Sequence, residues 1–216
     1  MTENTAQTSA EQDEYFLDTP LIREFIADVR STLAQHSDVS AGLDALQPRF
    51  AALLNDKTWL PAEFAAPYTA SSMGGGIGTW LLFRAADRSL SLFSLVVPPG
   101  SETPVHDHLA WGFVGLYRGD QVETVYERTD DGTEHEHAAL RVAEINTLVP
   151  GQFYKLLPPD GDIHAVKTIS DDASISIHLL ANDTGCVVRH AFDPSHDHVR
   201  QFRSGYSNVA CVDDAG

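Results

Sequence analysis

The stretch PVHDHLAWG (Pro104–Gly112) places two histidines, His106 and His108, one residue apart, shortly after an apolar, strand-like run. On a β-strand this spacing puts both imidazoles on the same face. A closed barrel can aim that face inward, towards a third ligand from another strand. Neutral imidazole is a common ligand for Fe, Zn, Ni and Cu. The stretch therefore predicts part of a metal site inside a β-structure.

A second stretch, PDGDIHAVKT (Pro159–Thr168), supplies a candidate third ligand, His164, which follows a Pro/Gly turn and opens a β-type run. Short β-type runs surround both stretches, separated by turns rich in Gly, Pro and Asp. These runs are TWLLFRAA, SLSLFSLVVP, FVGLYRG, QVETVYER, AALRVAE, FYKLL, AVKTIS, SISIHLLA and CVVRHAF. Many short strands at regular spacing predict a sandwich or a barrel.

The triplet His-Asp-His occurs again at 196–198, within PSHDHVRQF (Pro194–Phe202). This copy follows a turn signal, precedes a charged and irregular segment, and has no histidine beyond it. We expect it to lie in an exposed terminal segment and to bind no metal. His135 and His137 flank an acidic turn, and we expect them to be solvated.

Composition excludes several classes of partner. The chain has 216 residues and a formal net charge of −17, which disfavours binding to nucleic acid or to anionic membranes. The longest apolar stretches are the length of strands, and the first residues lack the basic start and apolar core of a signal peptide. Cys186 and Cys211 are not spaced as a metal-binding pair. We therefore expect free thiols and a cytoplasmic location.

The sequence indicates four segments. Residues 1–14 are expected to form a disordered tail, 15–67 a helical segment, 68–208 a β-barrel with the metal site, and 209–216 a C-terminal tail. In DTPLIREFIADVRSTLAQH, Asp18 or Thr19 is the expected helix cap, with Pro20 in the first turn. A second helix over AGLDALQPRFAALLND is expected to be interrupted or restarted at Pro48.

These residues resemble two motifs of the cupin superfamily. Gly100–Gly119 resembles the first motif, in which a glycine, five residues and His-x-His precede a later glycine. The pattern of 159–164, Pro-x-Gly-x-x-His, resembles the second. The glutamate of the usual first motif is missing, because Gly112 or Phe113 occupies its place. The resemblance implies a mainly β cupin double-stranded β-helix barrel (jelly roll) with an N-terminal helical extension and a three-His site.

Within the cupins, Tyr68–Asn208 is similar to the cysteine dioxygenase-like family of thiol dioxygenases, especially its bacterial members. The similarity rests on HDHLAWG, GDIHAVK, SIH, RHAFDP (Arg189–Pro194) and SGYSN (Ser204–Asn208). It implies Fe(II) on His106, His108 and His164. The implied reaction uses O₂ to convert a small mercapto carboxylate, 3-mercaptopropionate-like or cysteine-like, to its sulfinate. The oligomeric state, a homo-oligomer included, stays open.

The resemblance also assigns roles beyond the metal. Arg189 is the favoured anchor for the substrate carboxylate and Arg84 the alternative, because guanidinium pairs bidentately with carboxylate. Ser176 and His178 correspond to two members of the family's Ser-His-Tyr relay. Leu180 stands where the tyrosine would be, so either another phenol replaces it, Tyr154 or Tyr206 for example, or the pocket differs.

Two other function classes stay open. The first is a three-His cupin enzyme of different chemistry, such as oxidative C–C cleavage or metal-assisted isomerisation. The second is a non-catalytic ligand-binding cupin. The identity of the metal is also open, because Fe, Ni and Zn all accept three imidazoles.

Overall fold

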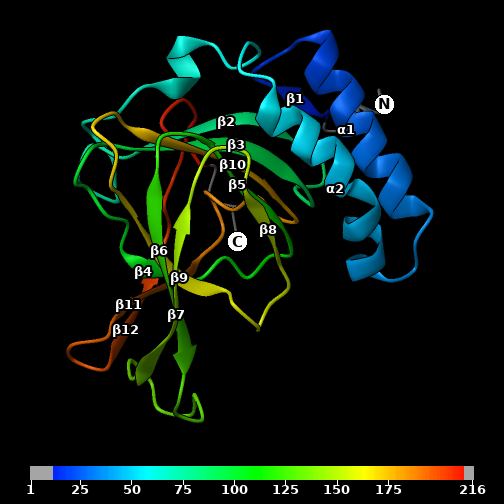
Figure 1. Cartoon of the computed structure of the whole chain (residues 1–216). Helices are drawn as coiled ribbons and strands as arrows, with labels where there is room; N and C mark the ends of the chain where they lie inside the picture. The colour runs from blue at the N-terminus through cyan, green and yellow to red at the C-terminus, as the bar shows by residue number, and fades with distance from the viewer. Residues whose placement is uncertain (1–11, 212–216) are drawn as a thin grey trace, which may run out of the picture.

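The computed structural model describes residues 12–211, which form two antiparallel six-stranded sheets and two α-helices (Figure 1). The first sheet has the order β1 (Glu14–Tyr15), β2 (Gly78–Arg84), β3 (Ser91–Val97), β10 (Ser174–Leu180), β5 (Gly112–Arg118), β8 (Phe153–Leu156). The second sheet has the order β12 (His198–Phe202), β11 (Arg189–Asp193), β4 (Val105–His106), β9 (Ile163–Thr168), β6 (Gln121–Arg128), β7 (Leu140–Leu148).

The eight strands from β3 to β10 form a jelly roll. In the first sheet they follow the order β3-β10-β5-β8, and in the second the order β4-β9-β6-β7. When these strands are numbered one to eight along the chain, the first sheet has the order 1-8-3-6 and the second sheet the order 2-7-4-5. This is the strand order of a double-sheet jelly roll. The predicted fold class, mainly β with an N-terminal helical extension, is confirmed.

The extension consists of α1 (Pro20–Ala34), α2 (Val39–Asn55) and a short 3₁₀ turn, η1 (Ala62–Ala65). Thr19 caps α1, because its side chain accepts the Ile22 N–H at 3.3 Å. The predicted interruption of the second helix is wrong, since α2 continues through Pro48. Pro48 is exposed, so water can satisfy the carbonyl that loses its helical partner.

The two helices cover the outer face of the first sheet (Figure 1). Strand β10 shows how the layers divide. Ile175, Ile177 and Leu179 belong to the cluster beneath the helices. Side chains alternate along a strand, so Ser176 and His178 point the other way, into the barrel. The apolar half of β10 therefore anchors the helices, and its other half lines the interior.

Two predictions for the termini of the chain need correction. Residues 1–11 of the predicted tail lie outside the described residues, but Asp13 and Glu14 belong to the fold. Glu14 pairs with Arg84 in the sheet, and Asp13 forms a salt bridge with Arg30. At the other end, the segment after the second His-Asp-His is not irregular. His198–Phe202 forms β12, an edge strand on β11.

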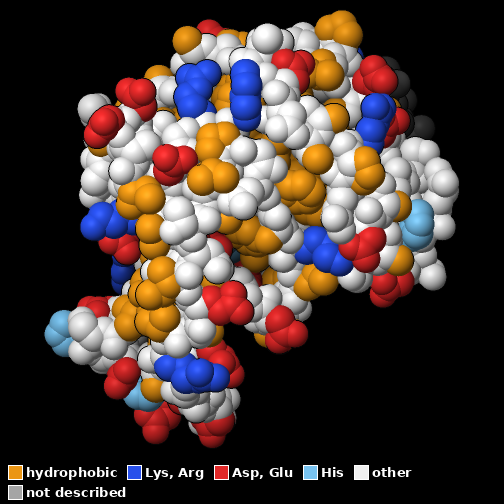
Figure 2. Space-filling model, viewed as in Figure 1, with side chains coloured by type: hydrophobic (Ala, Val, Ile, Leu, Met, Phe, Trp, Pro, Cys, Tyr) orange, Lys and Arg blue, Asp and Glu red, His pale blue; other side chains and the backbone are white. Residues whose placement is uncertain are grey.

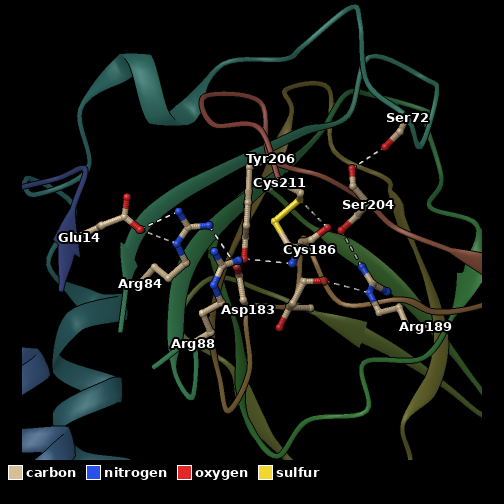
Figure 3. Close-up of a disulfide and its surroundings, with 12 residues drawn as sticks. Glu14, Ser72, Arg84, Arg88, Asp183, Cys186, Arg189, Ser204, Tyr206 and Cys211 are labelled. Atoms are coloured by element: carbon tan, nitrogen blue, oxygen red, sulfur yellow. Dashed lines mark hydrogen bonds and ion pairs between the residues drawn. A yellow bond between two sulfur atoms is a disulfide. The ribbon is translucent and has the colours of Figure 1, made fainter. Parts of the chain in front are cut away.

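The expectation of free thiols is wrong. Cys186 and Cys211 form a disulfide, with their Cα atoms 5.3 Å apart (Figure 3). The pair is 25 residues apart in sequence, and only the folded chain brings it together. The prediction of a cytoplasmic location was based partly on free thiols, and that argument no longer holds, because structural disulfides are rare in that compartment. No helix within residues 12–211 is long and apolar enough to cross a membrane.

Candidate metal centre

Three buried histidines meet on the inner face of the second sheet. His106 on β4 lies directly opposite His164 on β9, so their side chains share a face. His108 follows two residues later, in the loop after β4. One ligand atom from each lies within 4.8 Å of the other two. Within residues 12–211, this is the only group of three or more His, Cys, Asp or Glu side chains arranged to hold a metal ion.

Hydrogen bonds fix the orientation of two of these imidazoles. His106 Nδ1 lies 2.8 Å from the carbonyl oxygen of Pro104. His108 Nδ1 lies 3.1 Å from Asp162 Oδ1, and the two Asp162 oxygens also accept the backbone N–H groups of His108 and Leu109. With Nδ1 donating outward, Nε2 remains as the metal ligand, which is the usual arrangement in protein metal sites.

The third imidazole is held by a buried carboxylate. His164 Nδ1 lies 2.7 Å from Glu123 Oε1 on β6 and 3.2 Å from the hydroxyl of Tyr154 on β8. Burial favours the neutral acid, but hydrogen bonds from His164, Tyr154 and Asn146 hold the pKa of Glu123 below its ordinary value. Glu123 is therefore ionised and can accept the Nδ1 proton of His164.

The three residues fit a divalent metal ion. Burial, together with the Arg189 charge and the neighbouring imidazoles, holds the pKa of His106 and of His108 well below the ordinary value. Both rings are thus neutral at physiological pH and offer lone pairs rather than protons. The protein has a three-His metal-binding site.

Glu123 provides a test of the hydrogen bonds behind the ligands. We expect Glu123→Gln to weaken metal binding about 10- to 100-fold, because an amide orients the imidazole less firmly and adds no negative charge. Metal competition against a chromophoric chelator measures the change. Glu127→Gln on the same strand is the matched control, since Glu127 is exposed and paired with Arg141. Equal affinities for both variants would contradict this role of Glu123.

Ser176 and His178 face the site from the opposite sheet. Ser176 Oγ lies 2.9 Å from His178 Nε2, and the His178 ring stacks on Phe93 with a centroid distance of 4.6 Å. Its centroid lies 6.2 Å from that of His108. Within the described residues, His178 Nδ1 is buried without a hydrogen-bond partner. Burial keeps the pKa of His178 well below its ordinary value. A neutral imidazole with one unused nitrogen thus stands across from the ligands.

The wall beside this pair is apolar. Leu180 is fully buried in a cluster whose other members are Leu81, Phe93, Ala110, Val114 and Leu156. The rings of Tyr154 and Tyr206 pack against the same cluster. The Tyr154 hydroxyl contacts His164, whereas the Tyr206 hydroxyl accepts the Gly185 N–H at 3.0 Å. Of these two phenols, Tyr154 is therefore the one at a metal ligand.

Arg189 is a buried cation without a carboxylate partner in residues 12–211. Its Nε, Nη1 and Nη2 donate to the Thr184 carbonyl at 3.3 Å, the Asp107 carbonyl at 2.6 Å and Ser204 Oγ at 2.8 Å. Its guanidinium also lies over the Phe202 ring, 4.9 Å from the centroid. Burial lowers the pKa of Arg189 to about 10, so the group stays charged at neutral pH.

Two observations place Arg189 beside the metal ligands. Ala191, two residues along β11, lies opposite His106, so the Arg189 side chain points to the same face as that ligand. The Arg189 charge also contributes to the lowered pKa values of His106, His108 and His178.

Arg84 has a different environment. It forms salt bridges with Glu14 at 2.6 Å and with Asp183 at 3.1 Å, and Arg88 shares Asp183 (Figure 3). Burial disfavours its charge, but the two carboxylates raise the pKa of Arg84 above the ordinary value. Its charge is therefore already neutralised within the protein, unlike that of Arg189.

Several residues at the site were not predicted from the sequence. Asp107, between the two ligands of the first triplet, binds the backbone N–H of His190 at 2.7 Å and its Nδ1 at 2.6 Å. It thereby ties the ligand loop to the strand that carries Arg189. Both Asp107 and Asp162 had a local signal, because each is a carboxylate within two residues of a ligand in the sequence.

The second His-Asp-His lies in a contact between two hairpins. His198 is opposite His137, and backbone bonds join Ala138 to Asp197 and Val199 to Glu136. Figure 1 shows the β6–β7 and β11–β12 hairpins projecting together from the barrel. His196 is exposed and binds Asp193 at 2.8 Å. The triplet thus belongs to a surface contact, away from the three ligands.

A cleft of about 1120 Å³ runs between β7 and β8, where neither strand has a neighbour on its outer side. Figure 2 shows the molecule hollowed on this face. Glu123 and Tyr154 line the cleft, and both contact His164. The cleft therefore leads to the outer side of the third metal ligand.

No protein-family model matches the sequence. Similar solved structures include oxalate oxidase, at 14% identity over 60% of this chain and 62% of that one, with a TM-score of 0.42. Peruvianin-I, a cysteine peptidase from Thevetia peruviana latex, has 19% identity over 60% and 74%, with a TM-score of 0.41. The cupin_2 domain of an XRE family transcriptional regulator from Enterobacter cloacae has 22% identity over 48% and 94%, with a TM-score of 0.33. At such values, the assignment of the fold rests on the strand order.

Proposed function

We propose that this protein is an iron-dependent dioxygenase that oxidises a small mercapto carboxylate to its sulfinate. The observation that carries the proposal is the charge of the site. Three imidazole ligands, none of them a carboxylate or a thiolate, leave a divalent metal its full charge, and Arg189 adds a buried positive charge without a carboxylate partner in residues 12–211. A small molecule with a thiolate at one end and a carboxylate at the other matches these two centres.

The proposed reaction is balanced without a further reactant. The thiol gives up its proton, two S–O bonds form and the O–O bond breaks. Sulfur loses four electrons and O₂ accepts four. Fe(II), when bound, would lower the pKa of the thiol and supply the redox centre that reacts with O₂.

The residues of the chain would bind, orient and protect the substrate. Arg189 has two further N–H groups, one on each Nη, and these can bind a carboxylate. His178 Nδ1 can donate or accept a hydrogen bond, because the Ser176 hydroxyl adapts to either tautomer. Leu180 and the cluster around it exclude water from that side of the pocket. These residues would hold one orientation of the substrate while its thiol proton leaves.

Oxygen uptake with a panel of thiols tests the proposal. With the iron-loaded protein, we expect 3-mercaptopropionate to be consumed with one O₂ per thiol, and ¹⁸O₂ to deliver both atoms to the sulfinate by mass spectrometry. Cysteine should be a poor substrate, because an ammonium group against the apolar wall at Leu180 would be desolvated without a partner.

A preference for cysteine over mercapto acids without an amino group would contradict this description of the pocket. Should the iron-loaded protein leave all small thiol acids unchanged, a three-His enzyme of another chemistry becomes the better description. A protein purified with an empty three-His site and no affinity for metal would instead favour a ligand-binding cupin.

A further inference from the structure

The segment SGYSN (Ser204–Asn208) contains none of the three metal ligands, yet each of its residues makes a hydrogen bond in the fold. We call it the strap. Ser207 exchanges two hydrogen bonds with Thr79 of β2, from the Thr79 N–H to its Oγ and from its own N–H to the Thr79 carbonyl. The Asn208 side chain binds the Leu81 N–H at 3.0 Å and the Leu81 carbonyl at 2.9 Å. The strap thus docks on the first sheet beside β2.

The other side of the strap rests on the loop that follows β10. The Gly205 N–H donates to the Gly185 carbonyl at 2.8 Å, and the Gly185 N–H donates to the Tyr206 hydroxyl at 3.0 Å. A Cβ at position 185 would lie 2.5 Å from the Tyr206 ring, so this contact requires glycine. The disulfide between Cys186 and Cys211 closes the strap just beyond it (Figure 3).

The strap brings one side chain to the buried cation. Arg189 Nη2 donates to Ser204 Oγ at 2.8 Å, and Figure 3 shows the two groups side by side. The other two acceptors of Arg189 are backbone carbonyls, of Thr184 and Asp107. Within residues 12–211, Ser204 is therefore the only residue whose side chain accepts a hydrogen bond from Arg189. Both residues are buried, so water does not replace a lost contact freely.

We propose that Ser204 is a positioning residue that orients the Arg189 guanidinium towards the anionic end of the substrate, and that the disulfide holds it there through the strap. The inference rests on the proposed function, which assigns the substrate carboxylate to Arg189. A planar guanidinium pairs with carboxylate through two N–H groups only when its plane is correctly turned. The Ser204 contact would set the angle of that plane together with the Thr184 and Asp107 carbonyls.

Two variants of equal shape isolate the hydroxyl. Ser204→Thr keeps it and Ser204→Val removes it, so any difference between them is not one of packing volume. For 3-mercaptopropionate we expect Ser204→Val to raise KM about tenfold with kcat within about twofold, and Ser204→Thr to stay close to the wild type. For the neutral methyl ester of the same thiol, we expect the two variants to have equal KM values. Ser101→Ala, at a partly exposed serine whose hydroxyl donates to the Gly75 carbonyl, is the control for loss of a hydroxyl.

Binding of propionate to the metal-loaded protein, measured by calorimetry, separates this inference from the proposed function. If no thiol is oxidised but propionate binds Ser204→Val more weakly than Ser204→Thr, the positioning role stands and the reaction is different. Equal propionate affinities overturn the positioning role whatever the reaction. Equal KM losses for acid and ester, or a loss confined to kcat, overturn it as well.

The role of the disulfide is tested by combining variants. We expect the pair Cys186→Ser and Cys211→Ser to raise KM for 3-mercaptopropionate about threefold in the wild-type background and to have no further effect with Ser204→Val, because coupled residues are non-additive. If the increases in KM from the two changes multiply in the combined variant, or if loss of the disulfide changes KM in neither background, the disulfide does not act through Ser204.

Discussion

Replacing His164 with alanine is expected to abolish turnover and to weaken metal binding by more than about 100-fold. Loss of an outer hydrogen-bond partner alone costs about 10- to 100-fold in metal proteins, and His164 supplies one of the three ligand atoms itself. The variant would also leave Glu123 as a buried carboxylate that has lost a main hydrogen-bond donor. Metal per chain after dialysis, measured by elemental analysis, gives the result, and a thermal melt shows whether the variant folds.

His196→Ala is the matched control for this experiment. It removes a histidine from the second His-Asp-His, where His196 is exposed and bonded to Asp193. We expect its metal content and turnover to equal those of the wild type. Full metal retention in His164→Ala, or loss of metal in His196→Ala, would refute the ligand set of His106, His108 and His164.

The two triplets show how much of this site was predictable from the sequence. His106 and His164 each stand in a stretch that combines a turn signal with a strand-like run, and both are needed for the three-His pattern. The second triplet has the same letters but sits in an edge hairpin, where its residues contact the β6–β7 hairpin instead. Local context, rather than the triplet itself, distinguishes the metal site.

The positions of the residues that support the ligands were not predictable, because they depend on which strands become neighbours; Tyr154 was named from the sequence only as one of two phenols that could replace the missing tyrosine. Glu123 reaches His164 only because β6 lies beside β9, and Tyr154 reaches it from the opposite sheet. Nothing in QVETVYER indicates that its second polar residue faces inward. The disulfide has the same origin, since Cys186 and Cys211 meet only after the strap docks on β2.

The limits of strand prediction also have a physical cause. The long runs around β3, β5 and β10 were predictable because apolar residues fill the barrel and also face the helices. Strands β1 and β4 have two residues each, too few to show a period of two. Strand β12 buries only Val199 and Phe202 of its five residues, and its three exposed polar residues resemble those of a loop.

Arg189→Ala is expected to raise KM for the mercapto carboxylate with a much smaller change in kcat. A partly desolvated charge pair is worth about 2–5 kcal/mol when one partner is truncated, which corresponds to a loss of about 30-fold or more in kcat/KM. The loss falls on KM because the carboxylate is bound equally in the ground state and the transition state. Steady-state oxygen uptake at several thiol concentrations separates the two constants.

Two further variants distinguish a substrate anchor from a structural arginine. Arg189→Lys keeps the positive charge, but an ammonium group cannot pair with a carboxylate in a bidentate manner. We therefore expect this variant to recover little of the affinity for the mercapto carboxylate. Arg84→Ala is expected to change KM far less, since Arg84 is already paired with Glu14 and Asp183; its main effect should be a lower melting temperature. Equal losses in KM at positions 84 and 189 would mean that Arg189 is not the anchor. A large loss at 189 for the acid but not for its neutral ester would assign the substrate carboxylate to that guanidinium, because only the charged end of the thiol differs between the two.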